Sequence, residues 1–90
     1  MIDHYMQIDK EATGENIKRL MEEKGISISE VSKFLSLSCE QTVYRWFRGE
    51  TFPNTENGIN LALLLGVTIA DIYIPNKAIS MAGNSFNAFL

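Results

Sequence analysis

The chain has 90 residues, of which 46% are hydrophobic and 21% charged, a size that suits one compact domain and leaves no room for a second. Eight Lys and Arg residues against 11 Asp and Glu residues give a formal net charge of -3, which lowers the general expectation of nucleic-acid binding. The single cysteine, Cys39, cannot form an internal disulfide, and the sequence shows neither an export signal nor an apolar run of the about 20 residues that a membrane helix needs. These features predict a reduced protein of the cytoplasm.

The basic residues are concentrated in the middle of the chain. Six of the eight fall between positions 18 and 48, namely Lys18, Arg19, Lys24, Lys33, Arg45 and Arg48. A local basic face is therefore compatible with the acidic total.

Residues 1–10 show no sustained helical period and predict an N-terminal arm. Thr13 can cap a first helix, and Gly25 is placed to end it in a left-handed conformation. Its apolar residues Ile17, Leu20 and Met21 share one face at the spacing i, i+3, i+4.

Ser27 or Ser29 can cap a second helix, which is expected to be short and to stop near Ser36. The inward spacing of the first helix is repeated here by Val31, Phe34 and Leu35.

Ser38 and Gln41 have the spacing of a capping box, which predicts a third helix over about residues 39–48. Val43 and Trp46 lie three residues apart and are expected to face inward, with Phe47 beside them. The opposite side of this helix then exposes a polar and charged set: Glu40, Gln41, Tyr44, Arg45 and Arg48.

Pro53 marks a loop, after which Asn54 or Thr55 can cap a fourth helix that runs to residues 65–66. Thr68 can cap a brief fifth helix, which Pro75 ends. Five short helices without a convincing strand predict an all-α domain over residues 11–75. Residues 76–90 are then either a mobile tail or an arm that docks on a second subunit or a partner protein.

Three stretches and one proline occur in a fixed order along the chain. They are GENIKRLMEEKGIS at 14–27, TVYRWFRG at 42–49, Pro53, and ALLLGVTIADI at 62–72. In this order they resemble the XRE-type helix-turn-helix family of phage repressor and Cro-like regulators, over residues 13–73. The resemblance implies a compact five-helix repressor-like fold. It also implies a sequence-specific regulator of transcription, expected to be a repressor at the nucleoid, that places the helix of about residues 39–48 in the major groove of double-stranded DNA.

The resemblance also assigns roles to side chains. It implies base-reading positions at Glu40, Gln41, Tyr44 and Arg45, and phosphate-contacting positions at Lys33, Ser38, Thr42, Arg48, Thr51 and Asn54. Gln41 can pair with the N6/N7 edge of adenine, and Arg45 with O6/N7 of guanine. Glu40 can accept from cytosine N4, but it repels a phosphate where no such partner is present. Tyr44 can instead donate to a phosphate or cover the edge of the core.

Some positions depart from the usual pattern of the family. Ser36 stands at a turn position that usually holds glycine, and the turn over residues 37–40 is one residue longer than the common one. Ile28 stands where many relatives have a polar, phosphate-binding residue. Gly58 stands where a large apolar residue is usual, so the fourth helix is expected to be irregular there and to lose core volume.

A homodimer is expected, because two recognition helices about 34–36 Å apart give a small DNA reader more specificity than one. The apolar arms at both ends are the candidate dimer surfaces. The alternative is a protein-interaction module of the same fold, such as an antitoxin-like partner with weak or no DNA binding, which the acidic charge, Glu40 and Ile28 favour.

Neither catalysis nor a cofactor or metal is expected. His4 is the only histidine, and no Gly-rich phosphate loop or pair of carboxylates accompanies it. Cys39 is interpreted as an ordinary turn residue, because the chain has no second cysteine that could resolve an oxidised thiol.

Overall fold

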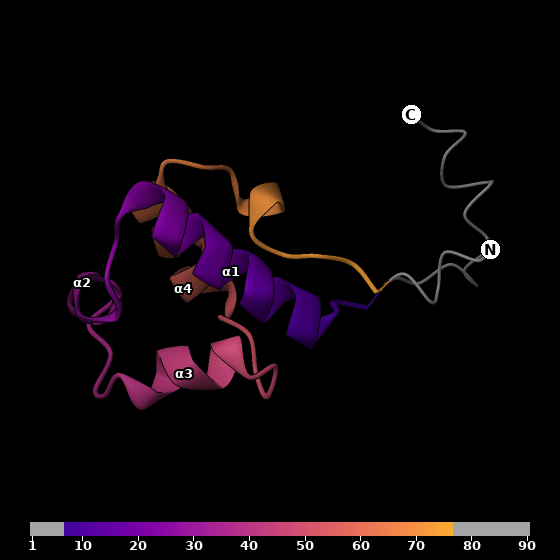
Figure 1. Cartoon of the computed structure of the whole chain (residues 1–90), viewed down its shortest axis with the longest axis horizontal. Helices are drawn as coiled ribbons and strands as arrows, with labels where there is room; N and C mark the ends of the chain where they lie inside the picture. Colours follow the sequence, from indigo (N-terminus) through magenta and orange to yellow (C-terminus); the bar gives the residue numbers. More distant parts are fainter. Residues whose placement is uncertain (1–6, 77–90) are drawn as a thin grey trace.

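The computed structural model describes residues 7–76, in which four α-helices and one turn of 3-10 helix follow one another (Figure 1). The α-helices are α1 (Lys10–Lys24), α2 (Ile28–Phe34), α3 (Gln41–Phe47) and α4 (Thr55–Leu65), and the 3-10 turn is η2 (Ile69–Asp71). Within these residues the fold is all-helical, as predicted, and the only strand-like pairing is an isolated bridge between Ile8 and Pro75. None of these helices has the length and apolarity needed to cross a membrane.

The predicted fifth helix is a single 3-10 turn, so the described part of the chain holds four α-helices instead of five. The Asp71 carboxylate accepts hydrogen bonds from the backbone N–H and the hydroxyl of Thr68, both at 2.9 Å. These bonds close the turn on itself, and they hold the pKa of Asp71 below its usual range. Pro75 follows too soon for a second turn to form.

α1 begins earlier than predicted, and Thr13 is not its cap. The side chain of Asp9 caps the helix by accepting from the N–H of Ala12 at 3.0 Å. Thr13 is fully buried one turn later, and its hydroxyl accepts the N–H of Ile74 at 2.9 Å. The end of α1 is as predicted, since Gly25 has a φ of 69°.

The predicted cap of α2 is confirmed, whereas the predicted capping box of α3 is wrong. Ser27 caps α2 in a capping box with Glu30, so the first of the two predicted serines is the cap. The box predicted between Ser38 and Gln41 is absent, because the residue before α3 is Glu40 and its side chain makes no capping bond. Phe34, predicted to face inward on α2, is 51% exposed.

The core gathers residues from every helix and from the chain after η2. Its largest fully buried side chains are Trp46, Ile17, Leu61, Ile72, Val31 and Val43. Val43 and Trp46 therefore face inward from α3, as predicted. A Cβ at Gly14 would overlap the backbone carbonyl of Trp46, so the glycine lets α1 and α3 approach closely and fixes α3 on the domain.

Gly58 does not disturb α4, contrary to the prediction. The helix is continuous from Thr55 to Leu65, and Asn54 caps it by accepting the N–H of Asn57 at 2.8 Å. The space beside Gly58 is filled by Tyr73, whose hydroxyl group a Cβ at position 58 would overlap. The Tyr73 hydroxyl donates to the carbonyl oxygen of Pro53 at 2.7 Å. The core volume that Gly58 lacks is thus supplied by a side chain fifteen positions further along the chain.

The two ends of the described chain meet beside the N-terminus of α1. The N–H of Asp9 donates to Ile74 O at 2.8 Å, and the N–H of Asn76 donates to Gln7 O at 2.6 Å. The predictions for His4 and for residues 77–90 lie outside the described residues.

Candidate nucleic-acid interface

α3 lies along one edge of the molecule and presents one side outward (Figure 1). Val43 and Trp46 anchor its inner side, with exposed fractions of 0% and 2%. The predicted base-reading residues Glu40, Gln41, Tyr44 and Arg45 are all exposed. The structure therefore brings the four predicted residues together at the surface of one short helix and its N-terminal flank.

Arg45 and Arg48 have different surroundings. The side chain of Arg45 makes no hydrogen bond or ion pair within residues 7–76. Arg48 pairs with Glu50, with Nε to Oε2 at 2.7 Å and Nη2 to Oε1 at 3.4 Å, and both side chains are about half exposed. The bond from Arg48 holds the pKa of Glu50 below its usual range, and the charge of Arg45 adds to the effect. Of the two arginines, Arg45 alone presents its charge without a carboxylate partner.

The side chain of Tyr44 contacts a neighbouring aromatic ring and is partly exposed. Its ring meets that of Phe47 edge to face, with centroids 6.1 Å apart, and the side chain is 41% exposed. The hydroxyl makes no hydrogen bond to the described part of the chain. Tyr44 thus packs its ring against Phe47 and keeps a hydroxyl that has no hydrogen-bond partner within residues 7–76.

The predicted phosphate-contacting residues lie in three places. Lys33 is exposed on α2, Ser38 and Thr42 flank the start of α3, and Thr51 and Asn54 lie in the loop before α4. Thr51 is exposed, whereas Asn54 uses its Oδ1 to cap α4. Its Nδ2 group has no hydrogen-bond partner among residues 7–76 and remains a donor.

Cys39 lies in the turn before α3, where the sequence places it, and its thiol has a lowered pKa. The Cys39 sulfur accepts a hydrogen bond from the N–H of Gln41, and this bond is the main reason why the pKa of the thiol lies below its usual value. Bonds from Thr42 and the charge of Arg45 act in the same direction. The thiol is exposed.

The connection between α2 and α3 contains a backbone conformation that favours glycine. Ser36 has a φ of 57°. Its N–H donates to Lys33 O at 3.2 Å, and the N–H of Leu37 donates to Ser32 O at 2.9 Å, which is the Schellman arrangement for a helix end. A serine therefore occupies the left-handed position that glycine usually takes at this turn.

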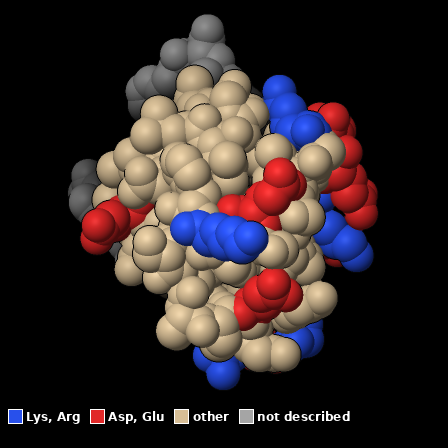
Figure 2. All heavy atoms as spheres, turned by 90° about the vertical axis from the view of Figure 1, so that its left-hand side faces the viewer, with Lys and Arg blue, Asp and Glu red and all other residues tan. Residues whose placement is uncertain are grey.

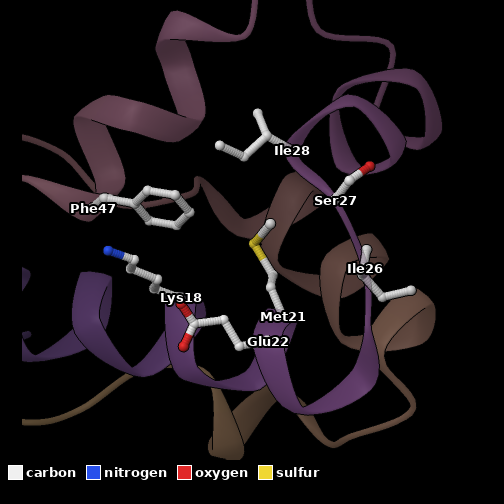
Figure 3. A pocket seen from close by; sticks show the side chains of 7 residues that line it. All are labelled: Lys18, Met21, Glu22, Ile26, Ser27, Ile28 and Phe47. Carbon is white, nitrogen blue, oxygen red and sulfur yellow. The ribbon is translucent and has the colours of Figure 1, made fainter.

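Ile28 belongs to an apolar hollow between α1, α2 and α3 (Figure 3). It points toward Phe47 across the hollow, and Met21 rises from α1 between them. The amino group of Lys18 lies 5.9 Å from the centre of the Phe47 ring. Ile28 is thus used for contact between helices, at the position where a polar phosphate-binding residue was expected from the resemblance.

The charge on the surface is mixed. Figure 2 shows the side of the molecule that carries α2, where basic and acidic groups alternate on a largely uncharged surface. No continuous basic patch covers this face. Among residues 7–76, no three His, Cys, Asp or Glu side chains gather closely enough to hold a metal ion.

A protein-family model described as helix-turn-helix matches residues 17–72, which is more than half of the chain. The match extends from the middle of α1 to the residue after η2, so it contains α2, α3 and the connection between them. No curated protein and no solved structure matches the chain significantly.

Proposed function

Since the chain belongs to the XRE-type helix-turn-helix family of DNA-binding regulators, we propose that it is a sequence-specific transcriptional repressor that inserts α3 into the major groove of double-stranded DNA. The observation that carries this proposal is the outward face of α3. Gln41 and Arg45 lie four residues apart and share that face, while Val43 and Trp46 hold the opposite face in the core.

The chemistry of this face suits base edges. Gln41 has a donor and an acceptor for adenine, and the unpaired guanidinium of Arg45 can reach O6 and N7 of guanine. Each such bidentate pair discriminates against a wrong base by about 1–3 kcal/mol. We assign Tyr44 to the same surface, where its free hydroxyl donates to a base or to the neighbouring phosphate. Glu40 completes the set as a selective acceptor for cytosine N4.

Phosphates on either side are contacted by the flanking donors. Ser38 and Thr42 supply donors at the start of α3, and Lys33 supplies a charge from α2. Thr51 and the Nδ2 group of Asn54 supply donors before α4. Arg48 joins them when it exchanges the Glu50 carboxylate for a phosphate, a small step because an exposed ion pair of this kind is weak.

The second candidate function is a protein-interaction module of the same fold. The alternating charges of Figure 2, the pairing of Arg48 with Glu50 and the apolar role of Ile28 all reduce the charge available for phosphates. A protein partner held by apolar contacts would bind with little dependence on salt, whereas DNA binding weakens steeply as salt rises.

The test is a salt titration of binding to double-stranded DNA with matched arginine variants. Arg48→Ala should reduce the slope of log K against log salt by about 0.9, because one phosphate contact is lost. Arg19→Ala is the control, since Arg19 forms an ion pair of the same length with Glu23 on α1, next to the segment after η2. Equal slopes for the two variants, or no binding of duplex at low salt, would remove the support for this face and favour the protein-interaction module.

A further inference from the structure

The proposed DNA interface leaves out one basic residue that lies against α3. This residue is Lys18 of α1, whose amino group lies 5.9 Å from the centre of the Phe47 ring. One turn earlier on α1, Gly14 lies so close to the backbone of Trp46 that a Cβ would overlap its carbonyl. Residues four apart share one side of a helix, so Lys18 belongs to the side of α1 that packs on α3.

The Phe47 ring orients Lys18 without neutralising its charge. The face of an aromatic ring attracts a cation through its quadrupole and takes no charge from it. In the described part of the chain, Lys18 forms no ion pair, although Glu22 lines the same hollow (Figure 3). The neighbouring Arg19, in contrast, is paired with Glu23 at 2.7 Å. Lys18 is exposed, so its charge is available to a ligand that approaches α3.

Phe47 lies at the border of the outward side of α3. Its ring meets that of Tyr44, one of the proposed base-reading residues, with centroids 6.1 Å apart. At about 100° per residue, Phe47 lies between the direction of buried Val43 and that of exposed Tyr44. We refer to the side of α3 that carries Tyr44 and Phe47 as the Tyr44 flank. A helix that fills the major groove has a phosphate strand on each side, so Lys18 approaches the position of one of these strands.

The Tyr44 flank receives little from the phosphate contacts already proposed. Thr42 lies on the other flank of α3, about 140° away from Phe47 around the helix. Ile28 stands where the resemblance places a polar, phosphate-binding residue, but it points into the hollow toward Phe47. Lys18 lines that hollow from α1. It therefore brings a positive charge to the place where Ile28 offers only an apolar side chain.

We propose that Lys18 binds a phosphate of the DNA strand that runs along the Tyr44 flank. The ammonium group donates hydrogen bonds to the phosphate oxygens, and the Phe47 ring holds the lysine side chain in position for this contact. The inference rests on the proposed function, because it requires α3 to lie in the major groove. A phosphate contact carries no sequence information, so Lys18 adds affinity for every duplex.

The test is a salt titration of binding to double-stranded DNA of random sequence, with wild type and Lys18→Gln in parallel. Glutamine removes the charge and keeps a polar side chain, so the circular dichroism should not change. Lys18→Gln should reduce the steepness of log K against log salt by about 0.9, because one phosphate contact is lost. Its deficit in affinity should then shrink about twofold each time the salt concentration is doubled.

Two further variants serve as controls. Lys24→Gln removes a charge from the same helix, at an exposed residue that forms no ion pair in the described part of the chain. Lys24 points about 120° away from Lys18 around α1, so this variant should keep the wild-type slope. Lys18→Arg keeps the charge and should keep the wild-type slope as well.

Two results would overturn the inference alone. The first is an equal slope for wild type and Lys18→Gln, even with a loss of affinity, because a merely structural role at the Phe47 ring gives that pattern. The second is an equal loss of slope in Lys18→Gln and Lys24→Gln, because any charge on α1 would then have the same effect. Failure of the proposed function is a different result, in which folded wild type binds no duplex at low salt, and it contradicts both proposals.

Discussion

Replacing Gly58 by alanine improves helix propensity but disturbs packing. The structure indicates which of the two effects determines the change in the free energy of unfolding. In an ordinary helix interior the change would stabilise the protein by about 1 kcal/mol. Here the new methyl group meets the Tyr73 hydroxyl and must displace the ring. Overpacking of this kind costs about 1–3 kcal/mol, and losing the hydrogen bond to Pro53 costs about 0.5–1.5 kcal/mol more. We therefore expect Gly58→Ala to lower the free energy of unfolding by about 2 kcal/mol, or the Tm by about 10 °C.

The assay is urea unfolding of a double-mutant cycle with Tyr73→Phe. Removing the hydroxyl relieves the nearest contact, so Gly58→Ala should cost at least about 1 kcal/mol less in the Tyr73→Phe background than in wild type. A Gly58→Ala variant that is more stable than wild type would show that propensity prevails. Additive effects of the two changes would show that Tyr73 does not occupy the space beside Gly58. Either result refutes the reasoning.

Three further predictions concern the turn, the thiol and the ion pair. Ser36→Gly should raise the free energy of unfolding in urea by about 0.5 kcal/mol, because glycine adopts a φ of 57° without strain, and a loss of stability would contradict this. Cys39 should react with iodoacetamide at a lower pH than a free cysteine peptide does, because the backbone N–H of Gln41 favours the thiolate. Arg45→Ala should move the midpoint of this reaction to higher pH, and a profile equal to that of the peptide would contradict the lowered pKa. Glu50→Gln should tighten binding to every duplex sequence, because Arg48 no longer has to give up a carboxylate to reach the phosphate, whereas Glu23→Gln at the pair with Arg19 should leave the affinity unchanged; equal effects of the two changes would contradict the role of Arg48.

Local patterns predicted much of the fold because they depend on residues close in sequence. The three-residue spacing of Val43 and Trp46 identified the buried side of α3. The helix ends at Gly25 and Gly66 were predicted in the same way, and both residues have a positive φ. Buried helix faces and helix ends depend on residues close in sequence, so a single sequence is enough to predict them.

Two of the wrong predictions, those for Thr13 and Gly58, share a physical cause, which is a partner distant in the chain. Thr13 looks like a cap, but its hydroxyl binds Ile74, which only the folded chain brings near. Gly58 looks like a missing core residue until Tyr73 is placed beside it. Neither contact leaves a trace in local periodicity.

The candidate site could be predicted from the sequence only in part. The exposure of Gln41 and Arg45 follows from the helical period. The pairing of Arg48 with Glu50 does not, because the chain turns at Gly49, with a φ of 76°, and brings together two residues that no helix spacing relates.

The most direct test of α3 as a reader of DNA is selection of bound duplexes from a random pool at physiological salt, with wild type and Arg45→Ala in parallel. We predict that wild type enriches a two-fold-symmetric site with half-sites about one helical turn apart, and that Arg45→Ala loses the preference at one base pair in each half-site while the rest of the site is retained. Failure of the folded wild-type protein to enrich any sequence, or an identical site for both proteins, would contradict the assignment of α3 to the major groove.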